Sequence, residues 1–196
     1  DVVKQQKEVL EPLALKKSIL IELSFGENLP EYVFGDEIRL RQVLTNIAGN
    51  AIKFTPQGGR VKIKVRHPDT NLDVILFEVM DSGIGIAENK LVEIFAPFEQ
   101  IIESRRHSKS AGTGLGLAIC KHLIQMMEGE IGVRSKQGVG SVFWFRIPLP
   151  KATEEQLKDL GLVGEEEIVS EHRQWDSSIL GVEDVSTNQF VITKLL

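Results

Sequence analysis

The sequence has few of the residues that build disulfide-rich, membrane-spanning or strongly basic proteins. It contains one cysteine, Cys120, which excludes an internal disulfide and favours a reducing compartment. No apolar run approaches the roughly 18–20 residues needed to span a bilayer, and the first residues do not resemble a signal peptide. The net charge of −5 excludes steering to nucleic acid by bulk positive charge. We therefore expect a cytoplasmic segment that contacts neither membrane nor nucleic acid.

The length bounds the domain organisation. With 196 residues, 42% of them hydrophobic and 26% charged, the chain can form one globular domain with a sizeable core and a fragment of a second. It begins at Asp1 rather than Met, which favours a piece of a longer parent protein. Whether that parent is anchored in a membrane is left open by these residues.

Apolar spacing predicts alternating helices and strands up to residue 150. Helical spacing is found over residues 2–15, 37–54, 87–95 and 115–128. Alternation predicts strands over residues 19–23, 60–66, 74–80, 130–135 and 141–147, the last four forming two hairpins. Asp36 is the expected N-cap of the second helix, and Gly129 is expected to end the last one.

Two regions differ from this pattern. Residues 99–113 are polar, charged and without periodicity, which predicts a long loop of the kind that is often functional. Residues 151–176 are rich in Glu, Lys and Asp and predict an acidic linker, partly helical. Beyond it, a short apolar run precedes Glu183 and Asp184, followed by a helical pattern up to Leu196.

A polar stripe follows the helix predicted over residues 37–54. Arg39, Gln42, Asn46, Asn50 and Lys53 are spaced 3, 4, 4 and 3 apart, which places them on one helix face. Asparagine is a poor residue within a helix because its side chain competes for the backbone. Amide oxygens suit Mg²⁺, and an ammonium group suits a phosphate. The stripe alone is explained equally well by a solvated helix face.

Two glycine-rich stretches, residues 81–86 and 112–117, add a second signal. Exposed peptide N–H groups at the start of a helix favour an anion, so the second stretch predicts a phosphate cradle. Neither stretch has the context of a dinucleotide-binding fingerprint or the Gly-Lys-Ser/Thr of a P-loop. Asp81, at the end of an apolar strand, could accept a hydrogen bond from an exocyclic amine such as that of adenine, and glycines at 83 and 85 would allow close approach. An ordinary strand-end turn is the alternative.

In this order and spacing the motifs resemble those of the ATP-binding catalytic domain of sensor histidine kinases, within the superfamily of gyrase, Hsp90, histidine kinases and MutL. Residues 46–55, 81–86, 94–100 and 112–117 are similar to the N, G1, F and G2 boxes. The resemblance covers residues 1–150. It implies an α+β fold, a two-layer α/β sandwich of the Bergerat type with a mixed, mainly antiparallel sheet, three helices on one face, and ATP held between helices and a lid.

The resemblance also implies residue roles. Asp81 would bind the adenine amine, Asn50 would ligate Mg²⁺, Asn46 would lie beside the phosphates or their waters, and Lys53 would contact the phosphates. Residues 99–113 would form the ATP lid, with Arg105 or Arg106 reaching the γ-phosphate; the lid is longer than usual, so Lys109 stays an alternative. Phe95 and Phe98 are expected to pack at the lid hinge. The remaining nucleotide-binding residues would be Gly83, Gly85, Ile86, Phe98, Gly112, Thr113, Gly114, Leu115, Gly116 and Leu117.

The chain lacks one part of such a kinase. None of its four histidines (His67, His107, His122 and His172) lies in a phosphoacceptor box, and each is interpreted as a surface or packing residue. The acceptor histidine is expected on a dimerisation hairpin before residue 1. This chain should therefore bind ATP without phosphorylating itself efficiently. The partners implied are that hairpin and a receiver domain or response regulator.

Residues 177–196 resemble the first strand and helix of a receiver domain, which implies a hybrid histidine kinase as the parent. Two other functions stay open. An ATPase or serine kinase of the same superfamily is disfavoured because ATPases of this kind usually have Glu where Asn46 stands, and an amide cannot act as a general base. A non-catalytic nucleotide sensor is disfavoured because no box residue is missing.

Overall fold

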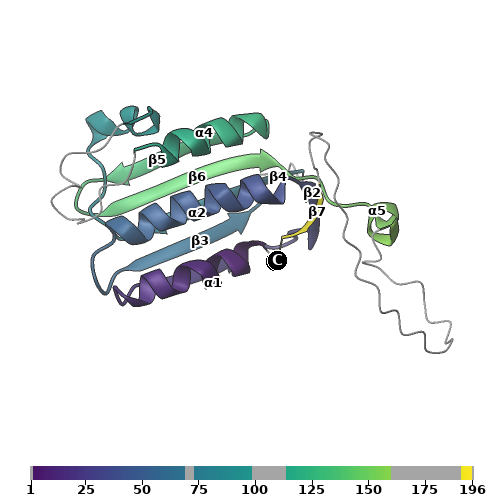
Figure 1. Ribbon diagram of the computed structural model, residues 1–196, viewed down its shortest axis with the longest axis horizontal. Helices are drawn as coiled ribbons and strands as arrows, with labels where there is room; N and C mark the ends of the chain where they lie inside the picture. Colours follow the sequence, from purple (N-terminus) through teal and green to yellow (C-terminus); the bar gives the residue numbers. More distant parts are fainter. Residues whose placement is uncertain (1, 69–72, 99–113, 160–190, 196) are drawn as a thin grey trace, which may run out of the picture.

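The computed structural model describes residues 2–68, 73–98, 114–159 and 191–195. Its main part is one mixed sheet with helices on one side (Figure 1). The strands are β1 (Leu20–Phe25), β2 (Tyr32–Gly35), β3 (Arg60–Arg66), β4 (Val74–Asp81), β5 (Glu130–Lys136), β6 (Gly140–Pro148) and β7 (Val191–Lys194). The α-helices are α1 (Val2–Leu15), α2 (Glu37–Phe54), α4 (Gly116–Met126) and α5 (Glu154–Asp159).

Five strands form the main sheet in the order β1-β3-β4-β6-β5. Only the β1–β3 pair is parallel, so the sheet is mixed and mainly antiparallel, as predicted. The register places Asp81, the last residue of β4, opposite Val61 on β3 and Ser141 on β6. The strand that carries the candidate adenine-binding carboxylate is therefore central, with a partner on each side.

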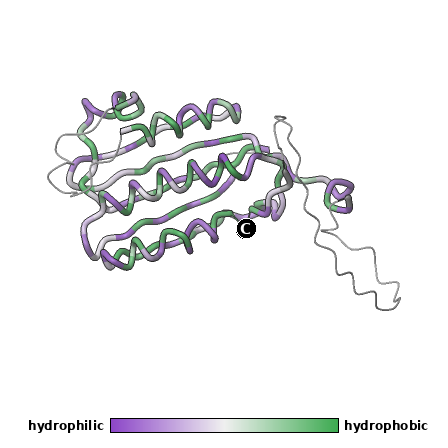
Figure 2. Tube along the Cα trace, viewed as in Figure 1, coloured by the Kyte–Doolittle hydropathy of each residue, from purple (hydrophilic) through white to green (hydrophobic). Residues whose placement is uncertain are grey.

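Helices α1, α2 and α4 cover one face of this sheet, which confirms the two-layer α+β prediction (Figure 1). The core lies between the layers, where alternate residues of β3 and β4 meet the apolar face of α2; Phe77 and Phe145 stack there with ring centroids 4.7 Å apart. Hydrophobic and hydrophilic residues alternate along α2, as expected for a helix with one buried side (Figure 2).

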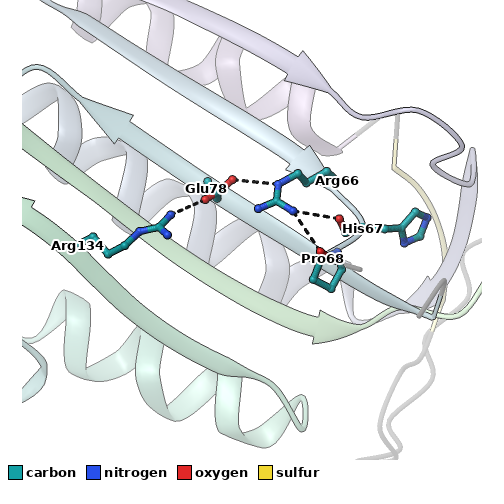
Figure 3. Close-up of polar contacts among 5 residues, drawn as sticks. All are labelled: Arg66, His67, Pro68, Glu78 and Arg134. Carbon is teal, nitrogen blue, oxygen red and sulfur yellow. Dashed lines mark hydrogen bonds and ion pairs between the residues drawn. The ribbon is translucent and has the colours of Figure 1, made fainter. Parts of the chain in front are cut away.

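The other face of the sheet carries a buried carboxylate. Glu78 on β4 accepts from Arg66 on β3 at 3.2 Å and from Arg134 on β5 at 2.8 Å (Figure 3). Arg66 also donates to the carbonyl oxygens of His67 and Pro68. Opposite charges thus compensate the burial of Glu78, and this network ties three strands together without reaching Asp81.

Several sequence predictions hold and others need correction. Asp36 caps α2 by accepting from the Arg39 N–H at 3.0 Å, as expected. Residues 87–95 were predicted as one short helix, but they form two 3-10 turns, Glu88–Lys90 and Glu93–Phe95. Gly129 does follow α4, yet Glu128 is the residue in the left-handed conformation, with φ of 57°. A Cβ atom on Gly129 would lie 2.4 Å from the Arg146 carbonyl oxygen, so glycine is needed there for close packing.

The prediction of a helix near the C-terminus is wrong for residues 191–194, which form a strand. The helical pattern up to Leu196 gives way to β7, which pairs antiparallel with β2, a strand that sequence patterning did not identify. Three β-branched residues in succession, Val191 to Thr193, favour a strand once a partner edge is available. The linker is partly helical, as predicted, over α5. Glu183 and Asp184 lie outside the described residues.

Candidate functional site

The site starts from the polar face of α2. Seven residues of the helix are buried on its other face, whereas Asn46, Asn50 and Lys53 are half-buried. Asn46 and Asn50 are one turn apart, so their amides lie on the same side of the helix. The Lys53 ammonium lies 5.3 Å from the ring centroid of Phe54. The predicted stripe therefore exists as a partly enclosed surface.

The loop after β4 folds back onto the end of α2. The Gly83 N–H donates to Oδ1 of Asp81 at 2.8 Å, and the Ile84 N–H donates to the Phe54 carbonyl oxygen at 3.3 Å. A Cβ atom on Gly83 would lie 2.6 Å from both of these acceptor oxygens. Glycine at this position is thus required by the contact between the loop and the helix.

The same loop is held on its other side by the β5–β6 hairpin. The Gly138 N–H donates to the Ile84 carbonyl oxygen at 2.7 Å, and the Ile86 N–H donates to Oγ of Ser135 at 2.8 Å. Gly85 has φ of 66°, and a Cβ atom there would lie 2.1 Å from the Lys136 carbonyl oxygen. Both glycines thus allow close approach of the protein's own backbone.

Asp81 is a perturbed carboxyl group. Burial raises its pKa above the ordinary value of 3.8, and hydrogen bonds from Gly83 and from the backbone and hydroxyl of Ser141 oppose that rise. Ser141 was not identified from the sequence, although the predicted hairpin would have placed it near the end of β4. A half-buried carboxylate with fixed donors is a suitable acceptor for an amine that arrives from outside.

The N-terminus of α4 meets the middle of α2. A Cβ atom on Gly116 would lie 3.9 Å from both Cγ and Oδ1 of Asn46. Burial raises the pKa of the Cys120 thiol to about 11, although a hydrogen bond with the Asn46 side chain acts to lower this pKa. Cys120 is fully buried, so its side chain is part of the hydrophobic core. Helix α2 therefore bonds the loop after β4 at Phe54 and faces the start of α4 at Asn46.

The F-box residues behave differently from one another. The Phe98 N–H donates to the Gly114 carbonyl oxygen at 3.1 Å, so these two described residues, far apart in sequence, are hydrogen-bonded to each other. Phe95 packs against the core, as predicted. The prediction that Phe98 packs is wrong, because its side chain is 74% exposed and its φ is 65°. Its backbone carries the contact.

The remaining predicted residues are placed only in part. Ile86 is buried, and Leu115 and Leu117 are half-buried, with Leu117 against the core. Gly114 adopts φ of 73°. Arg105, Arg106, Lys109, Gly112 and Thr113 lie outside the described residues. Within the described part of the chain, no group of three or more His, Cys, Asp or Glu side chains could hold a metal ion.

Comparison with known proteins identifies the family. Residues 35–151 match the family described as "Histidine kinase-, DNA gyrase B-, and HSP90-like ATPase". The chain belongs to this family. RcsC, a curated relative, is a sensor histidine kinase, and the catalytic domain of the histidine kinase ThkA is 30% identical over 90% of its length, so these residues form the ATP-binding catalytic domain of a sensor histidine kinase.

Two curated relatives show the extent of the likeness. The chain is 42% identical over 142 residues to the aerobic respiration control sensor protein ArcB of Escherichia coli K12, covering 72% of this chain and 18% of ArcB. It is 38% identical over 185 residues to the sensor histidine kinase RcsC of the same strain, covering 94% of this chain and 18% of RcsC. This domain thus spans about a fifth of those relatives.

Solved structures share the fold. Full-length ShkA in complex with AMPPNP is 36% identical, with a TM-score of 0.66 over 77% of this chain and 30% of ShkA. ThkA in complex with the response regulator protein TrrA is 28% identical, with a TM-score of 0.59 over 75% of this chain and 39% of ThkA. Among the residues that our structure describes, no helix is both long and apolar enough to cross a membrane.

Proposed function

We propose that this domain binds ATP with Mg²⁺ and transfers the γ-phosphoryl group to a histidine on a dimerisation hairpin outside the 196 residues. The observation that carries the proposal is the position of α2, which contacts the Asp81 loop at Phe54 and the start of α4 at Asn46. One helix thus links the candidate adenine acceptor to the candidate phosphate cradle. The complex of the related ShkA with AMPPNP supports the same ligand class.

Asp81 would accept the adenine amine. Its carboxylate already accepts from Gly83 and Ser141, which fixes its orientation before the base arrives. Gly83 and Gly85 shape the loop that carries it, and Ile86, buried beside Ser135, anchors the far end of that loop. Recognition of a flat base by a pre-oriented acceptor costs little reorganisation on binding.

The phosphates would lie between α2 and the start of α4. Asn46 and Lys53 come from α2, and the first peptide N–H groups of α4, from Gly116 onward, lie at a helix N-terminus, which favours anions. Thr113, Leu115 and Leu117 would contact the phosphates from the same stretch of chain. The Phe98 N–H, which donates to the Gly114 carbonyl oxygen, would hold the backbone of this stretch in place. Arg105 and Arg106 are our candidates for the γ-phosphate.

Asn50 could provide a protein oxygen for Mg²⁺ beside a nucleotide. Mg²⁺ is usually held by one or two protein oxygens, with phosphates and waters completing its shell. A half-buried amide one turn from Asn46 meets that requirement. When bound, the ion would neutralise charge on the phosphates.

The chemistry needs positioning and charge neutralisation more than covalent catalysis. Lys53 and the lid arginines supply positive charge, and Asn46 orients rather than deprotonates, since an amide is no general base. Transfer to a protein acceptor is thereby favoured over attack by water.

We place the catalytic domain at residues 1–150, an acidic linker at 151–176 and the start of a receiver-like domain at 177–196. The match to RcsC is longer than the catalytic domain, which supports a hybrid kinase as the parent. A receiver domain or response regulator would then take the phosphoryl group, in line with the complex of the related ThkA with TrrA.

The test mixes this chain, Mg²⁺ and γ-labelled ATP with a separately made hairpin of the parent protein. Acid-labile, base-stable label on the hairpin is expected, and a hairpin with its histidine replaced by glutamine is the control. Release of labelled inorganic phosphate with no label on the hairpin would favour an ATPase instead. Absence of ATP binding by the chain would refute the proposal altogether.

A further inference from the structure

Lys17, in the turn between α1 and β1, makes an unusually complete set of contacts with the end of α2. Its ammonium group donates to the carbonyl oxygens of Ile52, Lys53 and Thr55, at 2.9, 2.8 and 2.6 Å. Its three N–H donors are therefore all used. A positive charge at the C-terminus of a helix is also favoured by the helix dipole.

These contacts complete the hydrogen bonding of the last turn of α2. The final carbonyl groups of a helix have no partner within it. The Phe54 carbonyl oxygen accepts from the Ile84 N–H of the Asp81 loop, while Lys17 takes the carbonyls on either side of it. Lys17 and the Asp81 loop thus bind the same turn of backbone through adjacent carbonyl oxygens.

The turn that carries Lys17 is itself fixed. The Gly58 N–H donates to the Lys17 carbonyl oxygen at 3.0 Å, and the Leu20 N–H donates to the Gly59 carbonyl oxygen at 3.1 Å. Partial burial lowers the pKa of the Lys17 side chain. The neighbouring Lys16 is exposed, so it provides a natural control at the adjacent position.

We propose that Lys17 is a positioning residue of the ATP site. By holding the last turn of α2, it sets the backbone of Lys53, whose side chain is a phosphate candidate, and the Phe54 carbonyl on which the Asp81 loop rests. Lys17 would touch neither base nor phosphate. The inference rests on the nucleotide site proposed above and adds a residue from outside the four boxes.

Lys17→Met keeps an unbranched side chain of similar length and removes the three donors. We expect the Kd for Mg-ATP to rise by about tenfold, by analogy with the loss of affinity when an outer-shell partner of a metal ligand is removed. Lys17→Gln, which retains donors without the charge, should give an intermediate Kd. Binding is measured by calorimetry at a temperature where circular dichroism shows every variant to be folded.

Two controls separate positioning from simple stabilisation. Lys16→Met should bind Mg-ATP as the wild type does. Ile147→Val, a buried change at the opposite end of β6 from Ser141, should lower the melting temperature without changing the Kd.

The outcomes are distinct. A wild-type Kd in Lys17→Met, or in Lys17→Gln if the methionine variant does not fold, would overturn the positioning role and leave the nucleotide site intact. An equal rise in Kd for Ile147→Val would also overturn it, since stability alone would then explain the effect. If the wild-type chain itself binds no ATP, the proposed function and the role of Lys17 fail together.

Discussion

Gly116 faces Asn46 across the junction of two helices, such that a Cβ atom added to Gly116 would be 3.9 Å from the Asn46 amide. The two residues belong to motifs that are far apart in sequence, the G2 and N boxes. The contact brings the N-terminus of α4 to the polar face of α2.

Gly116→Ala should separate folding from binding. The distance of 3.9 Å is an ordinary van der Waals contact, so a methyl group fits. Alanine in place of a helical glycine should raise the free energy of unfolding by up to about 1 kcal/mol, as measured by urea denaturation. The methyl group would nonetheless crowd the space where we place the phosphates, so the Kd for Mg-ATP should rise several-fold. Unchanged affinity would argue against phosphates at this junction.

Asp81→Asn should weaken ATP binding by about one to two orders of magnitude, since it removes a charged acceptor whose hydrogen bonds contribute about 1.5–3 kcal/mol. Calorimetric titration with ATP and with GTP is the measurement, because GTP lacks the amine at that position. Wild-type affinity for ATP in the variant would count against Asp81 as the adenine acceptor.

The pH dependence of stability should also report on Asp81. The pKa of Asp81 is raised above its ordinary value of 3.8 in the folded state. Between the pKa of Asp81 in the unfolded chain and its higher pKa in the folded chain, the folded chain therefore binds more protons than the unfolded chain. The free energy of unfolding should therefore gain a contribution from Asp81 as the pH falls through this interval, and lose it as the pH rises. Urea denaturation of the ligand-free wild type and of Asp81→Asn, between about pH 4 and about pH 7, should show this contribution in the wild type only. Parallel pH profiles would contradict the raised pKa.

Asn50→Ala tests the metal ligand. We expect the variant to lose affinity for ATP in the presence of Mg²⁺ by roughly tenfold or more, while affinity measured in EDTA changes little. Gln42→Ala, an exposed change on the same helix, is the matched control. An equal loss with and without Mg²⁺ would show that Asn50 acts on the nucleotide or the fold rather than on the ion.

Gly85→Ala and Gly138→Ala form a pair that isolates steric conflict from backbone strain. Both glycines have positive φ, 66° and 79°. Only at Gly85 would the Cβ atom meet another group, the Lys136 carbonyl oxygen at 2.1 Å, whereas nothing lies within 4 Å at Gly138. Gly138→Ala should cost about 1 kcal/mol, as measured by urea denaturation, and Gly85→Ala about 3 kcal/mol or more. Equal losses would mean that the loop moves away from the hairpin easily.

Local patterns in the sequence were sufficient for the elements that carry the site. The 3.6-residue period of α2 separates its apolar face from Asn46 and Asn50, and alternation defines β4 up to Asp81. These features depend only on neighbours within a few residues, so they can be predicted from spacing. The order of the four motifs then indicated the family, which the comparisons confirmed.

Contacts between distant segments could not be predicted in this way. Ser141 lies opposite Asp81 because of the register in which β6 pairs with β4. Lys17 reaches the end of α2 because the turn that contains it is hydrogen-bonded to the turn at Gly58 and Gly59. The strand Val191–Lys194 replaced a predicted helix for the same reason, since an available edge at β2 outweighed a weak local preference. The sequence by itself determined the helical period of α2 and the residue types on its polar face, because period and residue type are local properties. Only the tertiary structure decided what holds Asp81 and the end of α2 in place, because those bonds depend on register and packing between remote parts of the chain.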